Sequence, residues 1–515
     1  MDHTKANAFS KEASPTVCGL RAWLLVTAAV SILLSGCAVG PDFKKPAAPN
    51  VDRYTSGPLP AAVSGANTVG GRPQLLLPGG DISAEWWTLF HSKPLNELID
   101  RALANNPDLK AAQAALAAAR ENVLAQRGAF FPSISAGFSA SRQSQSQELA
   151  PTPNFPIVPN EYQFNLFTPE VTVSYAPDVF GLNRRTVESL EAQQQGVRFQ
   201  MIATYTTLTS NVVVTAIQKA SVDSQVEAVR ELVAINAHLV KILQYQFDKG
   251  YASGLDLAAQ KAQLAQTEAM LPPLLKQATQ LHDLLAVLTG RFPSQAPDVA
   301  FELSSMTLPD KLPVSIPSAL VAQRPDIRQA EATLHAASAQ IGIAVANRLP
   351  DIQLTAAAGS SALAFGQLFM PGTNFWNVAG AVTEPIFDGN TLLHQERAAR
   401  DAYRQAAQQY RSTVLAAFQN VADTLTALEQ DGKALEAEAA AADAAKATLD
   451  LAQRQLKDGY AGYPALLNAE QSYQQARINL AQAEASRYAD TAALFQALGG
   501  GWWHREDLTE DRHEQ

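Results

Sequence analysis

The chain has 515 residues, of which 17% are charged and 47% are hydrophobic, and its formal net charge is −10 at pH 7. Alanine, glutamine and leucine are abundant, a composition that favours closely packed helices over the mixed core of a cytosolic enzyme. Lys and Arg form no dense block, which argues against a nucleic-acid partner.

Residues 1–36 have the pattern of a secretory signal peptide. Lys5, Lys11 and Arg21 precede a largely apolar run over residues 22–34. That run is too short to span a bilayer as a mature helix. No later stretch of eighteen apolar residues follows, so we expect any membrane crossing to use strands.

The apolar run ends in Leu34-Ser35-Gly36-Cys37, which resembles a lipobox, where the thiol of the cysteine carries the lipid. An N-acyl diacylglycerol on Cys37 would then be the covalent group of this chain, with no other cofactor. The alternative is a cysteine inside an ordinary signal peptide. Ala38 follows instead of Asp, which by resemblance to the bacterial sorting rule implies delivery to the outer membrane.

Residues 37–85 are rich in Pro and Gly and lack a hydrophobic period, which predicts an extended tether between the lipid and the folded body. Beyond it the sequence repeats itself, with 86–300 as a first repeat and 301–503 as a second. Residues 504–515 form a charged tail. The duplicated motifs recur at nearly constant spacing: Asn106-Pro107-Asp108-Leu109 and Arg324-Pro325-Asp326-Ile327, Phe131-Pro132 and Leu349-Pro350, Lys249-Gly250-Tyr251-Ala252 and Asp458-Gly459-Tyr460-Ala461.

Each repeat is predicted to run helix, strand, strand, long helix, turn, helix. Residues 133–142, 170–175, 352–358 and 376–382 alternate between apolar and polar side chains, the pattern of a membrane barrel strand with its apolar face outward. A soluble β-sandwich would produce the same alternation. The long segments 143–161 and 360–374 between paired strands are expected to be outer loops. Aromatic residues near the strand ends suggest an interfacial girdle: Phe130, Phe131, Tyr162, Phe164, Phe167, Phe375 and Trp376.

Four strands cannot close a barrel, because about eight is the observed minimum. Chains must therefore pool their strands, either as a dimer with eight or as a trimer with twelve. The helical segments 182–249 and 390–458 contain almost no Gly and no Pro, and each would extend roughly 100 Å if continuous. Two adjacent apolar seams in the first segment indicate a ring of packed helices. Helices of this length favour the wider, trimeric duct.

Each long helix is predicted to end at a glycine, Gly250 or Gly459, in a left-handed cap and to return as a shorter helix. Asp256 opens one return helix, where the helix dipole favours an acid. Pro464 lies in the first turn of the other. The pair Pro272-Pro273 predicts a kink, or a break between two stacked helices, in the first return helix.

Together these pieces resemble the outer-membrane factor family of TolC and OprM type, in its lipidated, NodT-like branch. The resemblance covers nearly all of the mature chain in order. It is carried by Cys37-Ala38-Val39-Gly40-Pro41-Asp42, Trp86-Trp87, Tyr175 through Phe180-Gly181, Pro385-Ile386-Phe387-Asp388-Gly389 and Gln496-Ala497-Leu498-Gly499-Gly500-Gly501-Trp502.

The resemblance implies a mainly α-helical homotrimer: a 12-stranded outer-membrane β-barrel continuous with a long periplasmic α-helical barrel. It also implies a periplasmic adaptor (membrane fusion) protein and an inner-membrane transporter as partners. The adaptor would meet the two hairpin tips, which are otherwise ordinary capping turns. These tips comprise Lys249, Gly250, Tyr251, Ala252, Ser253, Gly254 and Leu255, and Lys457, Asp458, Gly459, Tyr460, Ala461 and Gly462.

The family's closed gate uses charged residues just beyond these turns. Asp256 stands at the position of a linking acid, although a helix-capping role explains it equally well. Asn468 replaces the ring-forming Asp of the family and Gln471 replaces a nearby basic residue, which puts an aspartate ring in doubt. Glu470 is not assumed to substitute for Asn468, because two residues along a helix point roughly 200° apart.

The predicted function is passive export of small molecules such as drugs or toxic compounds, as the outer-membrane part of a tripartite pump of the RND type. No phosphate-binding loop, metal-spaced His pair or nucleophile motif is present in the mature sequence, so an enzyme is not expected. Two alternatives remain: the outer-membrane duct of a type I protein secretion system, and a non-conducting periplasmic coiled-coil lipoprotein scaffold.

Overall fold

A computed structural model describes residues 38–146, 161–296 and 301–509 of the chain. Cys37, the signal peptide and the last six residues of the charged tail lie outside the described residues. The described chain divides into two compact units. The first comprises the described residues up to 44, Arg120–Gln193 and Leu334–Ala406, and the second comprises Lys45–Ala119, Gln194–Thr333 and the chain from Ala407 onward.

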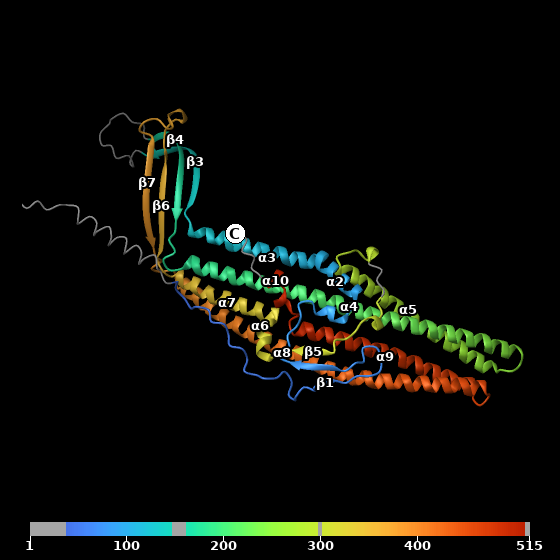
Figure 1. Ribbon diagram of the computed structural model, residues 1–515. Coiled ribbons are helices and arrows are strands. Elements are labelled where there is room, and N and C mark those ends of the chain that lie inside the picture. The colour runs from blue at the N-terminus through green and yellow to red at the C-terminus, as the bar shows by residue number, and fades with distance from the viewer. Residues whose placement is uncertain (1–37, 147–160, 297–300, 510–515) are drawn as a thin grey trace, which may run out of the picture. The chain divides into compact units, whose positions relative to one another are not determined.

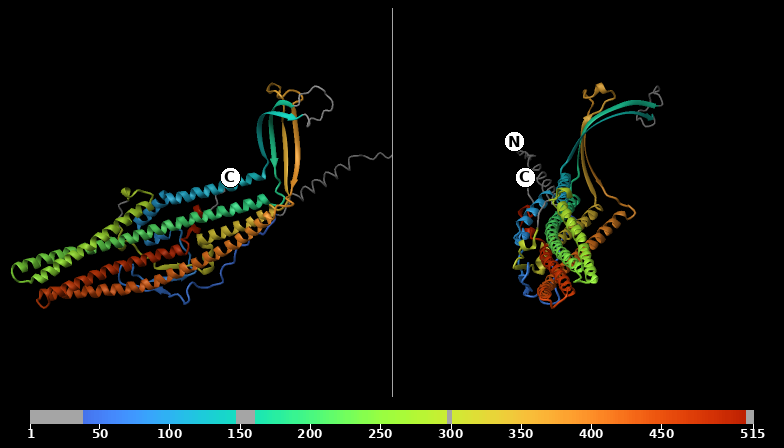
Figure 2. Two further views of the ribbon diagram at one scale, coloured as in Figure 1. Left: turned by 180° about the vertical axis from the view of Figure 1, so that it is seen from behind. Right: turned by 90° about the vertical axis from the view of Figure 1, so that its right-hand side faces the viewer.

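The first unit contains a four-stranded antiparallel sheet in the order β3-β4-β6-β7 (Figure 1). Its strands are β3 (Ser133–Ser146), β4 (Glu161–Tyr175), β6 (Asp351–Ser360) and β7 (Asn374–Thr383). The predicted strands are confirmed, but β3 and β4 extend further into the segment predicted to be an outer loop, of which residues 147–160 lie outside the described residues. Figure 2 shows that the sheet is strongly curved.

Two pairs of helices have matching lengths. Helix α4 (Leu182–Asp248) and helix α8 (Thr391–Lys457) have 67 residues each, and the return helices α5 (Gly254–Leu288) and α9 (Tyr463–Ala497) have 35 each. In the second unit the two hairpins lie side by side (Figure 1). They are joined by Arg477 with Glu231 at 2.6 Å and by Gln471 with Gln263 at 2.6 Å. None of the helices in the described part of the chain combines the length and apolar character needed to cross a membrane.

Helix α5 runs without interruption through Pro272 and Pro273, so, of the predicted kink or break, the break into two helices is wrong. Both prolines are exposed, and water can therefore satisfy the carbonyl groups of Glu268 and Ala269, which lose their helical donors. Packed residues before and after the prolines, such as Thr267 and Leu285, hold the helix on both sides.

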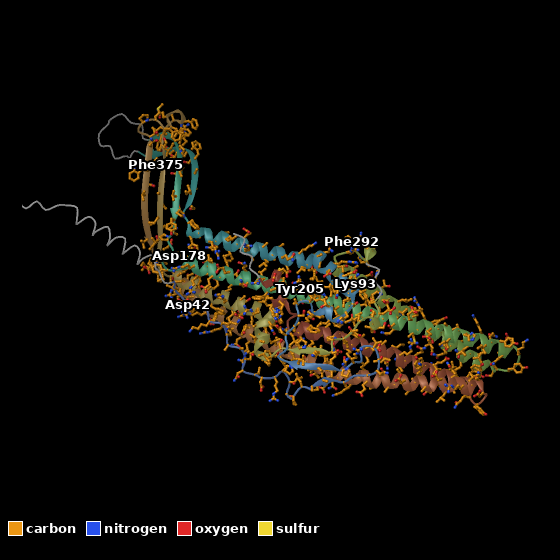
Figure 3. The ribbon with its side chains drawn as sticks, in the orientation of Figure 1. Asp42, Lys93, Asp178, Tyr205, Phe292 and Phe375 are labelled. Atoms are coloured by element: carbon orange, nitrogen blue, oxygen red, sulfur yellow. The ribbon has the colours of Figure 1, made fainter. Side chains whose placement is uncertain are left out.

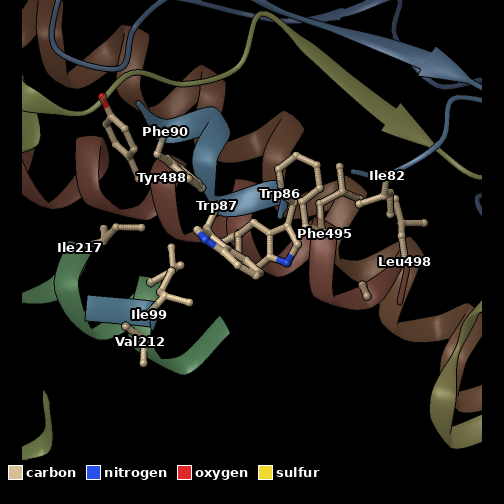
Figure 4. Packing of buried hydrophobic residues seen from close by; sticks show 14 of the residues in the cluster. Ile82, Trp86, Trp87, Phe90, Ile99, Val212, Ile217, Tyr488, Phe495 and Leu498 are labelled. Atoms are coloured by element: carbon tan, nitrogen blue, oxygen red, sulfur yellow. The ribbon is translucent and has the colours of Figure 1, made fainter. Parts of the chain in front are cut away.

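The shorter helices are α2 (Lys93–Asn105), α3 (Pro107–Arg127), α6 (Pro317–Gln323), α7 (Pro325–Ala346) and α10 (Glu506–Thr509). Single 3-10 turns are η1 (Trp86–Phe90), η2 (Gly128–Phe130), η4 (Pro293–Gln295), η5 (Leu303–Ser305), η6 (Phe365–Gln367) and η7 (Trp502–His504). In the second unit η1 lies in the largest apolar core, where Trp86 stacks on Phe495 with a centroid distance of 5.2 Å (Figure 4).

Part of the predicted tether is folded. Strands β1 (Ala62–Val63), β2 (Gln74–Pro78) and β5 (Lys311–Val314) form a second sheet in the order β1-β2-β5. Val63 and Gln74 are buried, and the Gln74 amide donates to the carbonyl oxygen of Pro309 at 3.1 Å. Residues 62–78 of the predicted extended tether are therefore part of the folded body, because β2 finds a parallel partner far away in the sequence.

Candidate functional site

The four-stranded sheet of the first unit has two chemically different faces. The strand register places Ile134, Val173, Ala356 and Val378 in one row across all four strands. Opposed residues of neighbouring strands point to the same side of a sheet, and alternate residues share a face. One face therefore consists of Ile134, Ala136, Phe138 and Ala140, of Phe167, Pro169, Val171, Val173 and Tyr175, of Ile352, Leu354, Ala356 and Ala358, and of Trp376, Val378, Gly380 and Val382.

The opposite face is mainly polar. It includes Ser133, Ser135, Ser139 and Ser141, Thr168, Glu170, Thr172 and Ser174, Gln353 and Thr355, and Asn377 and Thr383. The alternation seen in the sequence is therefore coherent across all four strands. The part of this face around exposed Ile134, Trp376 and Val378 carries no charge and is suited to contact acyl chains, whereas further along β3 and β4 the same face continues with Arg142 and Asn165.

The predicted aromatic girdle is only partly correct. Trp376 and Phe167 belong to the apolar face, but Phe375 lies opposite Gly359, which lies opposite Glu170, so Phe375 belongs to the polar face. In Figure 3 Phe375 lies at the end of the sheet remote from Asp178, which precedes α4. A glycine is needed at position 359, because a Cβ there would lie 2.4 Å from the backbone oxygen of Pro169 in β4.

The first described residues are held firmly within the first unit. Val39 donates its backbone N–H to the carbonyl oxygen of Phe180 at 3.1 Å. The Arg185 guanidinium donates to the Val39 carbonyl oxygen at 2.9 Å and to the Asp42 carboxylate at 2.9 Å, while its Nη1 donates to Glu188 at 2.7 Å. The chain directly after Cys37 is thus bonded to the start of α4. The sequence analysis did not single out Arg185.

Phe43 completes this attachment by stacking on His335 of α7, with ring centroids 4.3 Å apart. The His335 ring nitrogen lies 3.0 Å from the Glu188 carboxylate. Gly40 has φ of +94°, and a Cβ there would lie 2.4 Å from the Cα of Gly342. The backbone can approach this closely only because both residues are glycines.

The two hairpin tips have the same backbone geometry. Gly250 and Gly459 have φ of +77° and +78°. The N–H of Tyr251 is bonded to the carbonyl of Gln246 at 2.8 Å, and that of Tyr460 to the carbonyl of Gln455 at 2.8 Å. Both helices therefore end in a Schellman motif, as predicted from the glycines.

Both tips present apolar groups to solvent. Tyr251 is 83% exposed, Leu255 79% and Tyr460 86%. The second turn lacks a side-chain cap, and Pro464 occupies the first turn of α9. The remaining predicted tip residues lie in these two turns or at the adjoining helix ends: Lys249, Gly250, Ala252, Ser253 and Gly254, and Lys457, Asp458, Gly459, Ala461 and Gly462.

The predicted gate residues have different surroundings. The Ser253 hydroxyl caps α5: it accepts from the Asp256 N–H at 3.1 Å and donates to the Asp256 carboxylate at 2.7 Å. Asn468 is exposed. Gln471 donates to Gln263 of α5, so it links the two hairpins of one chain. Asp256 therefore takes part in capping α5, which is compatible with a second role at the gate.

Glu470 is 4% exposed, in contrast to the exposed Asn468, which agrees with their predicted opposite directions. Burial raises the pKa of Glu470 to about 7. Its Oε2 has no hydrogen-bond partner within the described residues. No cluster of His, Cys, Asp and Glu suited to a metal ion occurs in the part of the chain that the structure describes.

The sequence profile of the outer membrane efflux proteins matches residues 98–291 and 316–500, well over half of the chain. The chain belongs to the outer membrane efflux protein family. One curated relative of this chain is SepC from Pseudomonas putida, which is named a probable efflux pump outer membrane protein. The two are 28% identical over 484 residues, which cover 92% of this chain and 96% of SepC. OpmQ, named a pyoverdine export outer membrane protein, is 28% identical over 418 residues, 81% of this chain and 88% of OpmQ.

Solved structures of this family share the fold of the present outer membrane efflux protein. The outer-membrane channel OprN superposes with a TM-score of 0.79 at 24% identity, over 90% of this chain and 100% of OprN. The CmeC outer membrane channel of Campylobacter jejuni gives 0.80 at 21% identity, over 92% of this chain and 97% of CmeC. This outer membrane efflux protein is the outer-membrane component of an efflux system and a transport protein, not an enzyme.

Proposed function

We propose that three copies of the chain assemble into a passive exit duct for small molecules. The observation that carries the proposal is the apolar face that continues across all four strands of the sheet, in the row of Ile134, Val173, Ala356 and Val378. Within the described residues, strands β3 and β7 each pair on one side only. An open edge in lipid leaves backbone groups unbonded at several kcal/mol each, so β3 of one copy would pair with β7 of the next. Three sheets of four strands close a twelve-stranded barrel.

The helices would continue this barrel as a periplasmic tube. A helix of 67 residues is about 100 Å long, which exceeds the need of any globular domain. The matching lengths of α4 with α8 and of α5 with α9 support two structural repeats per chain. Ala434, Ala437 and Ala441 form an exposed small-residue stripe on α8, which permits a neighbouring helix to approach closely.

The lipid on Cys37 would anchor the chain in the periplasmic leaflet of the outer membrane. The bonds from Arg185 to Val39 and Asp42 support this role, because they keep Ala38 close to the start of α4. Ala38 lies so close to Gly181 that a Cβ on the glycine would be 2.6 Å from the Ala38 Cα. The lipid would therefore be held next to the junction of β4 and α4.

The hairpin tips would bind a periplasmic adaptor protein, which connects the duct to an inner-membrane transporter of the RND type in a tripartite pump. Exposed Tyr251, Leu255 and Tyr460 provide apolar contacts, and the glycine turns keep the backbone narrow. Asp256, Asn468 and Gln471 would surround the periplasmic gate, without the aspartate ring of other family members.

Small molecules are the proposed cargo. Two relatives of this chain come from Pseudomonas putida. TtgF is named a toluene efflux pump outer membrane protein, and ArpC is named an antibiotic efflux pump outer membrane protein. These names favour small-molecule export over the secretion of proteins. A non-conducting scaffold leaves the apolar sheet face unexplained.

Purified protein in planar bilayers tests the duct directly. We expect discrete single-channel currents. The mass of the purified particle, corrected for bound detergent, should equal that of three chains. Cysteines placed on the edge strands β3 and β7 should cross-link three chains and no more. A folded, lipid-inserted sample that passes no current, or a dimer as the largest cross-linked species, would overturn the proposal.

A further inference from the structure

The loop between β6 and β7, residues 361–373, exposes an unusual amount of apolar surface. Leu363, Phe365, Phe369 and Met370 are each about half exposed or more, with Phe369 at 69%. From Ser360 to Asn374 the sequence contains no Asp, Glu, Lys, Arg or His. A loop surrounded by water on all sides would be expected to carry polar or charged side chains.

The loop folds onto the apolar face of the sheet. Ala362 and Phe167 of β4 exchange two backbone hydrogen bonds, of 2.9 and 3.1 Å. The Phe365 ring packs edge-on against Phe138 and against Phe167, with centroid distances of 6.3 and 6.0 Å. Phe138 and Phe167 both belong to the apolar face. The loop therefore extends that face beyond the ends of β6 and β7, alongside the middle of β3 and β4.

The conformation of the loop is fixed by polar groups beneath it. The buried Ser360 hydroxyl donates to the Thr373 hydroxyl at 2.8 Å and accepts the N–H of Phe369 at 3.1 Å. Phe369 has φ of +66°, which is unfavourable for a bulky residue and persists only where the surroundings hold it. These bonds keep the polar backbone inside while Phe369 and Met370 face outward.

We propose that loop 361–373 is embedded in the acyl chains of the outer leaflet and anchors the outer rim of the barrel there. The inference rests on the proposed function, in which the apolar face contacts lipid. A second copy of the chain would join through the edges of β3 and β7, in the plane of the sheet. The loop instead covers the apolar side of β3 and β4, which faces away from that joint.

Site-specific fluorescence tests the position of the loop. Met370→Cys, or Leu363→Cys as a second site, is labelled with an environment-sensitive NBD group in the full-length protein. The protein is reconstituted into phosphatidylcholine vesicles with and without nitroxide-labelled lipid. Ala136→Cys on the apolar face and Ser139→Cys on the polar face of β3 serve as matched controls. The parent chain, labelled in parallel, gives the background labelling.

We expect blue-shifted emission at Met370 and Ala136 that nitroxide lipid reduces at least twofold, and no such reduction at Ser139. If Ala136 responds to nitroxide lipid while Met370 and Leu363 respond only to aqueous iodide, the loop lies in water and the inference is wrong, although the proposed duct stands. Blue-shifted but lipid-insensitive emission at Met370 would mean that protein covers the loop, which also overturns it. If Ala136 itself fails to respond, the proposed function fails together with the inference.

Discussion

The Arg185 guanidinium on α4 donates to the backbone carbonyl oxygen of Val39 at 2.9 Å, two residues after the proposed lipidation site. The Arg185 side chain is only 5% exposed, and it also bonds Asp42 and Glu188. Hydrogen bonds from charged groups contribute about 1.5–3 kcal/mol each in protected surroundings. One side chain therefore accounts for much of the attachment of residues 38–43.

We predict that Arg185→Ala releases this segment. Loss of about 2 kcal/mol corresponds to more than a tenfold increase in the open population. Trypsin should then cleave after Lys44 at least ten times faster, as mass spectrometry of timed digests would show. Arg127→Ala, which removes only the exposed ion pair with Glu191, is the matched control. Equal cleavage rates for both variants would contradict the role of Arg185.

Asp256 can be tested for a function beyond helix capping. Ser253→Ala removes the cap, a change of about 1 kcal/mol, whereas Asp256→Asn keeps an acceptor for the Ser253 hydroxyl and removes the charge. If Asp256 links the closed gate, Asp256→Asn should raise the open probability in planar bilayers and Ser253→Ala should not. The reverse result would assign Asp256 to capping alone.

Restoring the acid at position 468 should change ion selectivity. Asn468 is exposed on α9, so Asn468→Asp would place a carboxylate on each copy without burying charge. In a trimer the three carboxylates attract cations. The reversal potential in a salt gradient should therefore shift toward the equilibrium potential of the cation. Gln475→Asp, also exposed on α9 but further from the turn, controls for added charge. An unchanged reversal potential would place Asn468 outside the ion path.

The buried carboxyl of Glu470 predicts a pH dependence of stability. Its pKa is raised from the usual 4.5 to about 7, so the folded state binds the proton more tightly than the unfolded state. This contribution to stability is complete below about pH 4.5 and is lost as the pH rises through about 7. Glu470→Gln should abolish this pH-dependent loss of folding stability. We place the loss at about 2 kcal/mol per chain, a value reduced to allow for partial hydration of the carboxyl.

Melting temperatures at pH 5 and pH 8 measure this effect. We expect the wild type to melt several degrees lower at pH 8 and Glu470→Gln to show a smaller difference. Some difference should remain, because burial and a hydrogen bond to Asp431 raise the pKa of Asp490 to about 7 as well. The double variant with Asp490→Asn should show a smaller difference still, and part should remain because burial also raises the pKa of Glu484. Identical pH profiles for wild type and Glu470→Gln would mean that Glu470 is hydrated in the assembled protein.

Local chemistry allowed much of the fold to be predicted from the sequence. Ile134 and Val378 alternate with polar neighbours, so their shared face follows from the period of a strand. Gly250 and Gly459 mark helix ends because few other residues adopt a positive φ without strain. The near absence of Gly and Pro from α4 and α8 predicted their length.

Features that depend on distant partners could not be predicted in this way. Strand β2 is stabilised by β5, more than two hundred residues later, and its buried Gln74 resembles a loop residue in the sequence. Pro272 and Pro273 leave α5 continuous because packing on both sides outweighs the lost hydrogen bonds. Arg185 occurs beside Arg184, and nothing in that dipeptide distinguishes the arginine that bonds Val39 from the one that bonds Asp178.

Helices α4 and α8 have the same length, and so do α5 and α9, so the two hairpins match in length. Deleting one heptad from α4 and α5 alone would withdraw the first turn by about 10 Å relative to the second. The bonded pairs Arg477 with Glu231 and Gln471 with Gln263 would then fall out of register. We therefore expect a change of length in these hairpins to be tolerated only when all four helices are lengthened or shortened by the same number of residues.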